Sequence, residues 1–279
     1  MGLDVLLATC TDFIDGEPGH EALDAALVER GISARWALWD DVGVDWSQAR
    51  LVAVRATWDY ETRLPEFLEW ADSIGPSLLN GAAAFRWNTD KRYLVDLATS
   101  VPVVPTVVAA TADHVRAALA DRPAGAVVKP TVAAGGRGLR VVAPGADWDA
   151  DDRGPWIVQP LVESIHTLGE QSIFVLGGQA ISQVHKLPAS GEVRVHEFRG
   201  GTSEPVTLDA DLAELAVRAA DAAGILTGAE LSYVRVDLLH HDGAWCVSEV
   251  ELTEPGLYLD VVASNGAAFA DVVASALRS

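Results

Sequence analysis

Two stretches near the C-terminus alternate between apolar and charged residues, and this pattern restricts the fold more than any other feature of the chain. Residues 233–239 and 245–252 each have the two-residue period of a β-strand with one buried face and one polar face. The segment between them contains Asp242-Gly243, a dipeptide typical of hairpin turns. We therefore predict an antiparallel hairpin. Its polar face carries Arg235 and Asp237 from the first strand and Glu249 and Glu251 from the second.

The length of the hairpin loop decides whether the three carboxylates meet. A three-residue loop, with Gly243 in a left-handed bulge position, pairs His240 with Ala244. In that register Asp237 shares the face of the glutamates. A two-residue Asp-Gly loop shifts the register by one and turns Asp237 to the other face. The three-residue loop further predicts that Arg235 lies opposite Glu249 and that Asp237 lies opposite Val247.

The acidic face of this hairpin is a candidate metal site. Clustered carboxylates repel one another unless a cation neutralises them. Hard carboxylate oxygens suit Mg²⁺, which commonly bridges to nucleotide phosphates. The three-residue register therefore predicts a metal site formed by Asp237, Glu249 and Glu251. The alternative is an ordinary solvated polar face.

The first part of the chain has the strand–helix alternation of a small α/β domain. Residues 3–8 and 51–55 are apolar runs typical of buried parallel strands, and amphipathic helices are predicted near 20–30 and 62–74. Ligands of open parallel sheets gather at the carboxyl ends of the strands, so the polar residues that follow these strands are candidate substrate contacts. They are Thr11, Asp12, Trp58, Asp59 and Tyr60, and either aspartate is suited to an amino group. Alternatively, Asp59 caps the next helix and Trp58 belongs to the core.

The charge balance restricts the partners of the chain. The formal net charge is −20, which repels nucleic acid and anionic lipid at long range, so neither is expected as a partner. Any phosphate-bearing ligand is repelled as well, and a site for such a ligand therefore needs local cations. A lysine is a compact charge suited to a phosphate oxygen. The chain has only Lys91, Lys129 and Lys186, and scattered solubilising charges are the alternative interpretation.

No segment predicts a membrane-bound or secreted protein. No apolar run approaches the ~20 residues of a membrane helix, and the N-terminus lacks the basic residues that precede the apolar part of a signal peptide. Cys10 and Cys246 have neither a CxxC partner nor the spacing of metal ligands, as is typical of core residues in a reducing compartment. We therefore expect a cytoplasmic protein.

The pattern between the α/β domain and the hairpin is mixed. A glycine-rich turn at 135–138 separates predicted strands at 126–129 and 139–142. The polar stretch 188–205 is expected to be a functional loop. Other predicted elements are strands at 156–159, 172–176 and 180–185, and helices near 88–98, 111–120, 209–223 (ending at Gly224) and 265–277.

Several short motifs follow one another along residues 85–265, and neither a P-loop nor a dinucleotide-binding GxGxxG motif is among them. The motifs are Asn88–Lys91, Val103–Thr106, Val127–Pro130, Gly135–Gly138, Ile157–Leu161, Gly169–Ser172, His185-Lys186 with Arg194, Arg235–Asp237, Glu249–Glu251 and Pro255-Gly256. Their order resembles the ATP-grasp superfamily, most of all its glutathione-synthetase-like branch, which includes the cyclo-ligase that forms D-cycloserine. Many members have asparagine at the end of the metal motif where this chain has Glu251, which leaves the metal geometry open.

The resemblance implies a fold and a domain order. We expect an α/β protein, α+β in its ATP-grasp part, in which a small parallel-sheet pre-ATP-grasp domain at residues 1–87 precedes the two-subdomain ATP-grasp fold. Residues 88–160 then form the nucleotide-clamping subdomain, and residues 161–279 form the C-terminal subdomain with the metal and substrate site. A homodimer is compatible with the sequence but not required by it.

The resemblance also implies an activity that uses ATP and Mg²⁺. The expected enzyme is a ligase that activates a carboxylate as an acyl phosphate and couples it to an amine, with small-molecule substrates of amino-acid type. A small-molecule kinase and a non-catalytic ATP-binding module are the alternatives. The implied catalytic residues are Arg235, Lys186 and Arg194, and His185 is a further substrate candidate. The implied nucleotide-binding residues are Lys91, Lys129, Gly135, Gly136, Gly138, Gln159, Leu161, Val162, Glu163 and Glu170.

Overall fold

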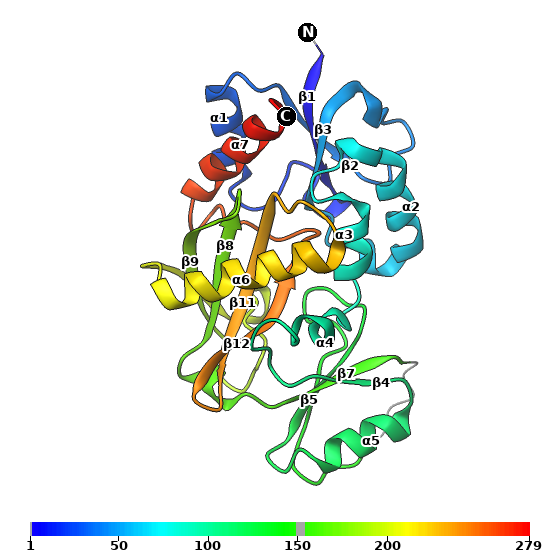
Figure 1. Cartoon of the computed structure of the whole chain (residues 1–279), viewed down its shortest axis with the longest axis vertical. Helices are drawn as coiled ribbons and strands as arrows, with labels where there is room; N and C mark the ends of the chain where they lie inside the picture. The colour runs from blue at the N-terminus through cyan, green and yellow to red at the C-terminus, as the bar shows by residue number, and fades with distance from the viewer. Residues whose placement is uncertain (1, 149–153) are drawn as a thin grey trace.

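The computed structural model describes residues 2–148 and 154–279, which form three β-sheets (Figure 1). The N-terminal sheet is parallel, with the strand order β2-β1-β3, and this confirms the predicted parallel sheet. It comprises β1 (Leu3–Thr9), β2 (Ala34–Leu38) and β3 (Ala49–Ala56). Strand β2 was not predicted, because this edge strand is largely exposed and lacks an apolar run.

Helices from both ends of the chain cover the N-terminal sheet. α1 (His20–Glu29) packs against α7 (Ser264–Ala276), and Figure 1 shows these two helices, blue and red, on the same side of the sheet. α2 (Leu64–Ile74) lies on the other side and packs against α3 (Gly81–Asn88). The last helix of the chain therefore packs against a helix that follows the first strand.

The second sheet is antiparallel and lies at the opposite end of the molecule from the N-terminal sheet (Figure 1). Its strand order is β4-β7-β5-β6. Helix α5 (Ala112–Ala120) buries Val115 and Ala118 against it. The loop between β5 and β6 contains the glycine-rich turn. The strands are β4 (Val107–Ala109), β5 (Ala126–Pro130), β6 (Arg140–Val142) and β7 (Trp156–Pro160).

The third sheet, which lies between the other two in Figure 1, has the antiparallel order β10-β9-β8-β11-β12. Helix α6 (Ala210–Thr227) packs against it and against α4 (Tyr93–Leu97). No helix in the described part of the chain is both long and apolar enough to cross a membrane. The strands are β8 (Glu170–Leu176), β9 (Gln179–Leu187), β10 (Thr202–Val206), β11 (Tyr233–His241) and β12 (Ala244–Glu251). Single 3₁₀ turns are η1 (Thr11–Phe13), η2 (Trp46–Gln48), η3 (Tyr60–Arg63), η4 (Gly75–Ser77), η5 (Glu163–His166) and η6 (Glu197–Arg199).

Two expected boundaries in this region are wrong. The predicted loop 188–205 ends in β10, an exposed edge strand whose polar composition conceals its pairing with β9. The helix predicted to stop at Gly224 continues to Thr227 and ends at Gly228, which has the left-handed backbone of a C-cap. Gly224 keeps helical geometry, and only the second glycine provides the stop signal.

The hairpin of β11 and β12 has a two-residue turn instead of the predicted three-residue loop. The turn contains only Asp242 and Gly243, both with positive φ, and His241 pairs with Ala244. A β-bulge at Ser248 then shifts the register between Asp237 and Leu238. With this turn alone, Asp237 would lie on the face of the sheet opposite to Glu249 and Glu251. The bulge places Asp237 on the same face as these glutamates. The predicted pairs Arg235–Glu249 and Asp237–Val247 are therefore wrong, and the observed pairs are Arg235–Glu251 and Asp237–Glu249.

Candidate active site

A cavity of about 590 Å³ is lined by residues from all three sheets and their loops. Most residues selected from the sequence line it. They are Asp12, Trp58, Asp59, Tyr60, Lys91, Lys129, Gly135, Gly136, Gln159, Leu161, Val162, Glu170, Lys186, Arg194, Arg235, Asp237, Glu249 and Glu251. The remaining four, Thr11, Gly138, Glu163 and His185, are not part of the lining.

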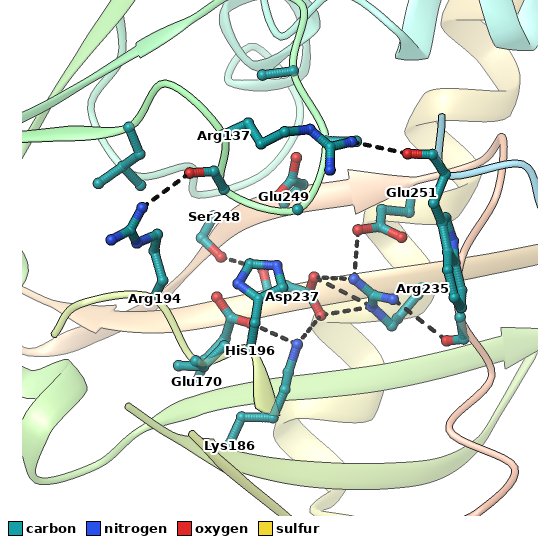
Figure 2. Close-up of a pocket in the computed structure, with 18 of the residues that line it drawn as sticks. Arg137, Glu170, Lys186, Arg194, His196, Arg235, Asp237, Ser248, Glu249 and Glu251 are labelled. Carbon is teal, nitrogen blue, oxygen red and sulfur yellow. Dashed lines mark hydrogen bonds and ion pairs between the residues drawn. The ribbon is translucent and has the colours of Figure 1, made fainter. Parts of the chain in front are cut away.

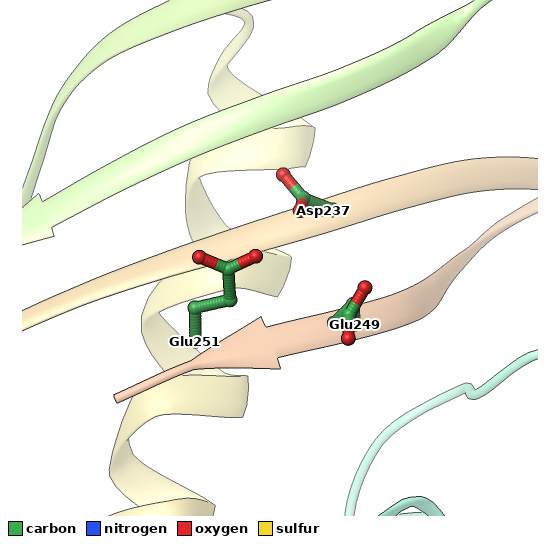
Figure 3. A group of neighbouring side chains, drawn as sticks. All are labelled: Asp237, Glu249 and Glu251. Atoms are coloured by element: carbon green, nitrogen blue, oxygen red, sulfur yellow. The ribbon is translucent and has the colours of Figure 1, made fainter. Parts of the chain in front are cut away.

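An acidic cluster lines the cavity. Asp237 on β11 and Glu249 and Glu251 on β12 each offer a carboxylate oxygen within 4.8 Å of the others, and Figure 3 shows them on one face of the hairpin. Asp237 is buried and the glutamates are partly exposed to the cavity. This all-oxygen donor set fits a hard divalent cation such as Mg²⁺.

Two cations, Arg235 and Lys186, form ion pairs with the acidic cluster. The guanidinium of Arg235 donates from Nε and Nη2 to Asp237 at 3.0 and 2.9 Å, and Nη2 is also 2.5 Å from Glu251. Lys186 Nζ lies 3.5 Å from Asp237 and 2.7 Å from Glu170 (Figure 2). Burial alone favours the neutral acid, but Arg235 and Lys186 outweigh it and hold the pKa of Asp237 well below its usual range. Asp237 is therefore ionised and can act as a ligand for a metal cation.

The two other lysines lie near Glu249. Lys91 Nζ is 2.8 Å from Glu249 and donates to the carbonyl of Ala133 at 2.8 Å. Burial opposes the charge of Lys91, but Glu249 overrides it and raises the lysine pKa. Lys129 makes no ion pair with any described residue, and burial lowers its pKa. An unpaired ammonium group in a cavity is available to an anionic ligand.

The loop that contains the glycine-rich turn forms one wall of the cavity. Arg194 Nη1 lies 3.4 Å from the carbonyl of Gly136, and a Cβ at Gly136 would lie only 2.8 Å from Arg194 Cδ. The positive φ favours glycine at position 136, and any other residue there would also displace the side chain of Arg194. Arg194 also pairs with Glu192 at 2.5 Å. Figure 2 shows Arg194 beside the loop rather than among the central charges.

Trp58, Asp59 and Tyr60 all line the cavity, and the alternative roles of helix cap for Asp59 and core residue for Trp58 are not observed. Asp59 provides no side-chain cap to the following 3₁₀ turn. Its carboxylate accepts from Trp39 Nε1 at 2.9 Å and pairs with Arg63 at 3.1 Å, which leaves Asp12 as the less engaged aspartate. Trp58 is not a fully buried core residue, because it lines the cavity and donates from Nε1 to the carbonyl of Glu254 at 3.0 Å.

Several cavity residues were not identified from the sequence. His196 lies in the centre of Figure 2, and its Nδ1 is buried without a hydrogen-bond partner in the described structure. Burial and the nearby Lys186 lower the pKa of His196 to about 4. Burial and the charge of Glu251 raise the pKa of Glu254 to about 8. In the sequence, His196 could have been noticed only because it lies in the long polar stretch 188–205. Glu254 could have been noticed only because it follows Glu251 by three residues.

A buried ion pair ties the N-terminal sheet to this site. Glu17 accepts from Arg55 Nη2 at 2.8 Å and from the backbone of Leu257 at 2.6 Å, and Arg55 also donates to the carbonyl of Pro255 at 2.6 Å. Both charged side chains are almost completely buried. The pair therefore holds the segment that follows the acidic motif of β12. Sequence patterns could not reveal it, because the partners lie on segments that only the tertiary fold brings together.

Comparison with known proteins agrees with this geometry. Residues 5–80 match the family described as the N-terminal domain of D-cycloserine synthetase DcsG, and residues 155–261 match the RimK-like ATP-grasp domain. The cycloserine biosynthesis protein DcsG of Streptomyces lavendulae is 34% identical over 89% of this chain and 90% of its own length. A glutathione synthetase of Prochlorococcus marinus is 30% identical over 78% of this chain and 69% of its own length.

Solved structures show the same relationship. The crystal structure of D-cycloserine synthetase DcsG superimposes with a TM-score of 0.85 and 29% identity, covering 98% of this chain and 99% of that chain. The similarity therefore extends through the N-terminal sheet as well as the two antiparallel sheets. The chain belongs to the ATP-grasp family of ligases, in the group that contains D-cycloserine synthetase DcsG.

Proposed function

We propose that this chain is an ATP- and Mg²⁺-dependent ligase that converts a carboxylate to an acyl phosphate and couples it to an amine, with release of ADP and phosphate. One observation carries the proposal: lysines and an acidic cluster face the same cavity. Asp237, Glu249 and Glu251 lie together there, with Lys91 beside Glu249 and Lys129 without an ion-pair partner in the described chain. This combination suits an anionic nucleotide whose phosphates are held by a divalent cation.

The residues divide into three roles. Asp237, Glu249 and Glu251 would hold Mg²⁺, which neutralises and orients phosphate charge when bound. Lys91 and Lys129 would bind the phosphates directly, together with the loop that contains Gly135 and Gly136. The cavity walls near Gln159, Leu161 and Val162 would contact the base.

Arg235 and Lys186 are placed to act on the reacting carboxylate. The Arg235 guanidinium presents a planar fork, which suits two oxygens of an acyl phosphate and later the tetrahedral oxyanion. Lys186 adds a buried positive charge beside it. The carboxylate carbon gains a bond to the amine nitrogen as its bond to the phosphate oxygen breaks, so phosphate is the leaving group.

The substrate is proposed to be a small amino-acid-like molecule. The similarity to a protein named for cycloserine biosynthesis supports this class. Asp12, Trp58 and Tyr60 line the part of the cavity next to the N-terminal sheet, where an amino group would meet a carboxylate. Both cysteines are free and buried, which supports a reducing, cytoplasmic location.

The test is an incubation of the purified chain with ATP, Mg²⁺ and a panel of D- and L-amino acids, each with and without hydroxylamine as a general amine. The proposal expects ADP, free phosphate and an amide or hydroxamate in equal amounts. A product that retains the phosphoryl group would instead identify a kinase. Failure of the whole panel together with failure to bind ATP would contradict the proposal.

A further inference from the structure

The side chain of Glu61 crosses from the N-terminal part of the molecule to the loop between β5 and β6. Glu61 lies in the 3₁₀ turn after β3, next to the cavity residues Trp58 and Tyr60. Its carboxylate accepts from the backbone N–H of Ala134 and from Nε of Arg137. Arg137 makes a second contact with the same region, since its Nη2 donates to the carbonyl of Trp58 at 2.9 Å.

The burial of Glu61 shows that this contact is more than an exposed ion pair. Its side chain is only 9% exposed, whereas that of Arg137 is 51% exposed. Exposed ion pairs contribute little, but a buried carboxylate must keep its hydrogen-bond donors or bear the cost of desolvation. For Glu61 those donors are one backbone N–H and one guanidinium, and both belong to the loop. The loop conformation and the burial of Glu61 therefore depend on each other.

The loop is fixed at two neighbouring points. Lys91, which pairs with Glu249, donates to the carbonyl of Ala133, and Glu61 accepts from the N–H of Ala134. Gly135 and Gly136 follow directly and line the cavity with positive φ. Glycine has no side chain to fix its own conformation, so contacts from outside, which include Arg194 at the carbonyl of Gly136 and the anchors on either side, decide where this backbone lies. Arg137 is the anchor on the far side.

We propose that Glu61 is a positioning residue that, through Ala134 and Arg137, holds the loop of residues 131–139 closed over the cavity. The assignment of the cavity to a nucleotide rests on the proposed function, whereas the contact itself does not. A closed loop keeps water from the phosphoryl group and from the acyl phosphate, so the amine is the acceptor. Because Glu61 follows Trp58 and Tyr60, the segment beside the small-molecule site also sets the position of the loop.

The first measurement is amide hydrogen exchange of the full chain without nucleotide, read in peptides that cover residues 131–139. Glu61→Gln should raise exchange in this loop by about tenfold or more, with other peptides unchanged. Glu69→Gln removes the same charge from an exposed position of α2 and should change nothing. Arg137→Gln alters the exposed partner and should raise loop exchange without unfolding the chain. The double variant should exchange no faster than the faster single variant, as expected for residues that act as a unit.

The second measurement is the affinity for AMP-PNP with Mg²⁺. Glu61→Gln should weaken binding about tenfold with an unchanged Tm, and Glu69→Gln should bind like the original chain. If the original chain does not bind AMP-PNP, the proposed function fails, while the exchange measurement still decides the role of Glu61. Unchanged loop exchange in Glu61→Gln and Arg137→Gln, or a rise spread evenly over all peptides, would overturn the positioning role.

Discussion

Asp237 lies directly opposite Glu249, although the two-residue turn of this hairpin on its own would place Asp237 opposite Ser248. The bulge at Ser248 makes the difference, and the Ser248 hydroxyl donates to the carbonyl of Asp237 at 2.9 Å. An irregularity in β12 therefore assembles the acidic cluster. Bulges commonly redirect a side chain next to a functional site.

Replacing Asp237 should weaken divalent-metal binding, while Glu251 and Glu170 still pair with Arg235 and Lys186. Asp237→Asn removes one charged ligand but keeps its size, so Mn²⁺ affinity, measured by electron paramagnetic resonance with AMP-PNP present, should fall by at least about tenfold. Asp242→Asn is the matched control, because it removes the same charge from the turn of the same hairpin, and asparagine tolerates the positive φ there. Equal Mn²⁺ affinity in the two variants would exclude Asp237 from the metal site.

Lys129 should contribute directly to nucleotide affinity. Lys129→Ala removes a charged donor that makes no ion pair in the described structure, so no buried carboxylate loses its counter-ion. The dissociation constant for ATP, measured by calorimetry, should rise roughly 10- to 100-fold. Arg218→Ala on the exposed face of α6 provides the charge-matched control. Unchanged ATP affinity in Lys129→Ala would remove this lysine from the site.

Arg55 should be essential for stability. Arg55→Ala leaves Glu17 buried without its counter-ion, so the free energy of unfolding should fall by about 3–5 kcal/mol. Arg50→Ala, on the same strand but exposed, should cost less than about 1 kcal/mol. Urea unfolding of both variants measures this difference. A loss of less than about 1 kcal/mol for Arg55→Ala would show that solvent reaches Glu17.

His196 should stay neutral far below the pH at which an ordinary histidine protonates. Burial lowers its pKa to about 4, with help from Lys186, Arg235 and Arg199 and against the opposing charge of Glu249. The unfolded chain binds this proton near pH 6.5, so the contribution of His196 to stability is complete above that pH and is lost as the pH falls towards 4.

The titration of His196 can be followed by ¹⁵N NMR of the imidazole, with the signal assigned from its absence in His196→Asn. Unfolding of His196→Asn should depend less on pH between about 4 and 6.5 than unfolding of the original chain. Protonation of His196 near pH 6.5 in the folded protein would contradict its burial.

The alternation of β11 and β12 was enough to predict the acidic face, because side-chain direction in a strand has a fixed period. The register was not predictable, since the bulge at Ser248 has no local signature such as glycine. The parallel N-terminal sheet was predicted from its apolar runs, except for the exposed strand β2. Sequence patterns likewise could not show that Glu61 reaches Arg137, because only the arrangement of the sheets brings the two loops together.

Arg235 should act on the reaction more than on ATP binding. Its fork contacts both Asp237 and Glu251, and Arg235→Lys keeps the charge but cannot reach two groups in the same way. We expect kcat to fall roughly 10²-fold with the dissociation constant for ATP little changed. If Arg235 is only structural, Tm should fall and activity should follow the folded fraction, which thermal unfolding measured beside kcat would reveal.

Activation of the carboxylate as an acyl phosphate is tested most directly by the fate of the carboxylate oxygens. The substrate identified from the amino-acid panel is prepared with ¹⁸O in its carboxylate and converted with unlabelled ATP and Mg²⁺, and the released phosphate is analysed by mass spectrometry. Acyl phosphate chemistry transfers one labelled oxygen to phosphate as the amine displaces it. Unlabelled phosphate from an active enzyme, or AMP in place of ADP, would contradict the mechanism.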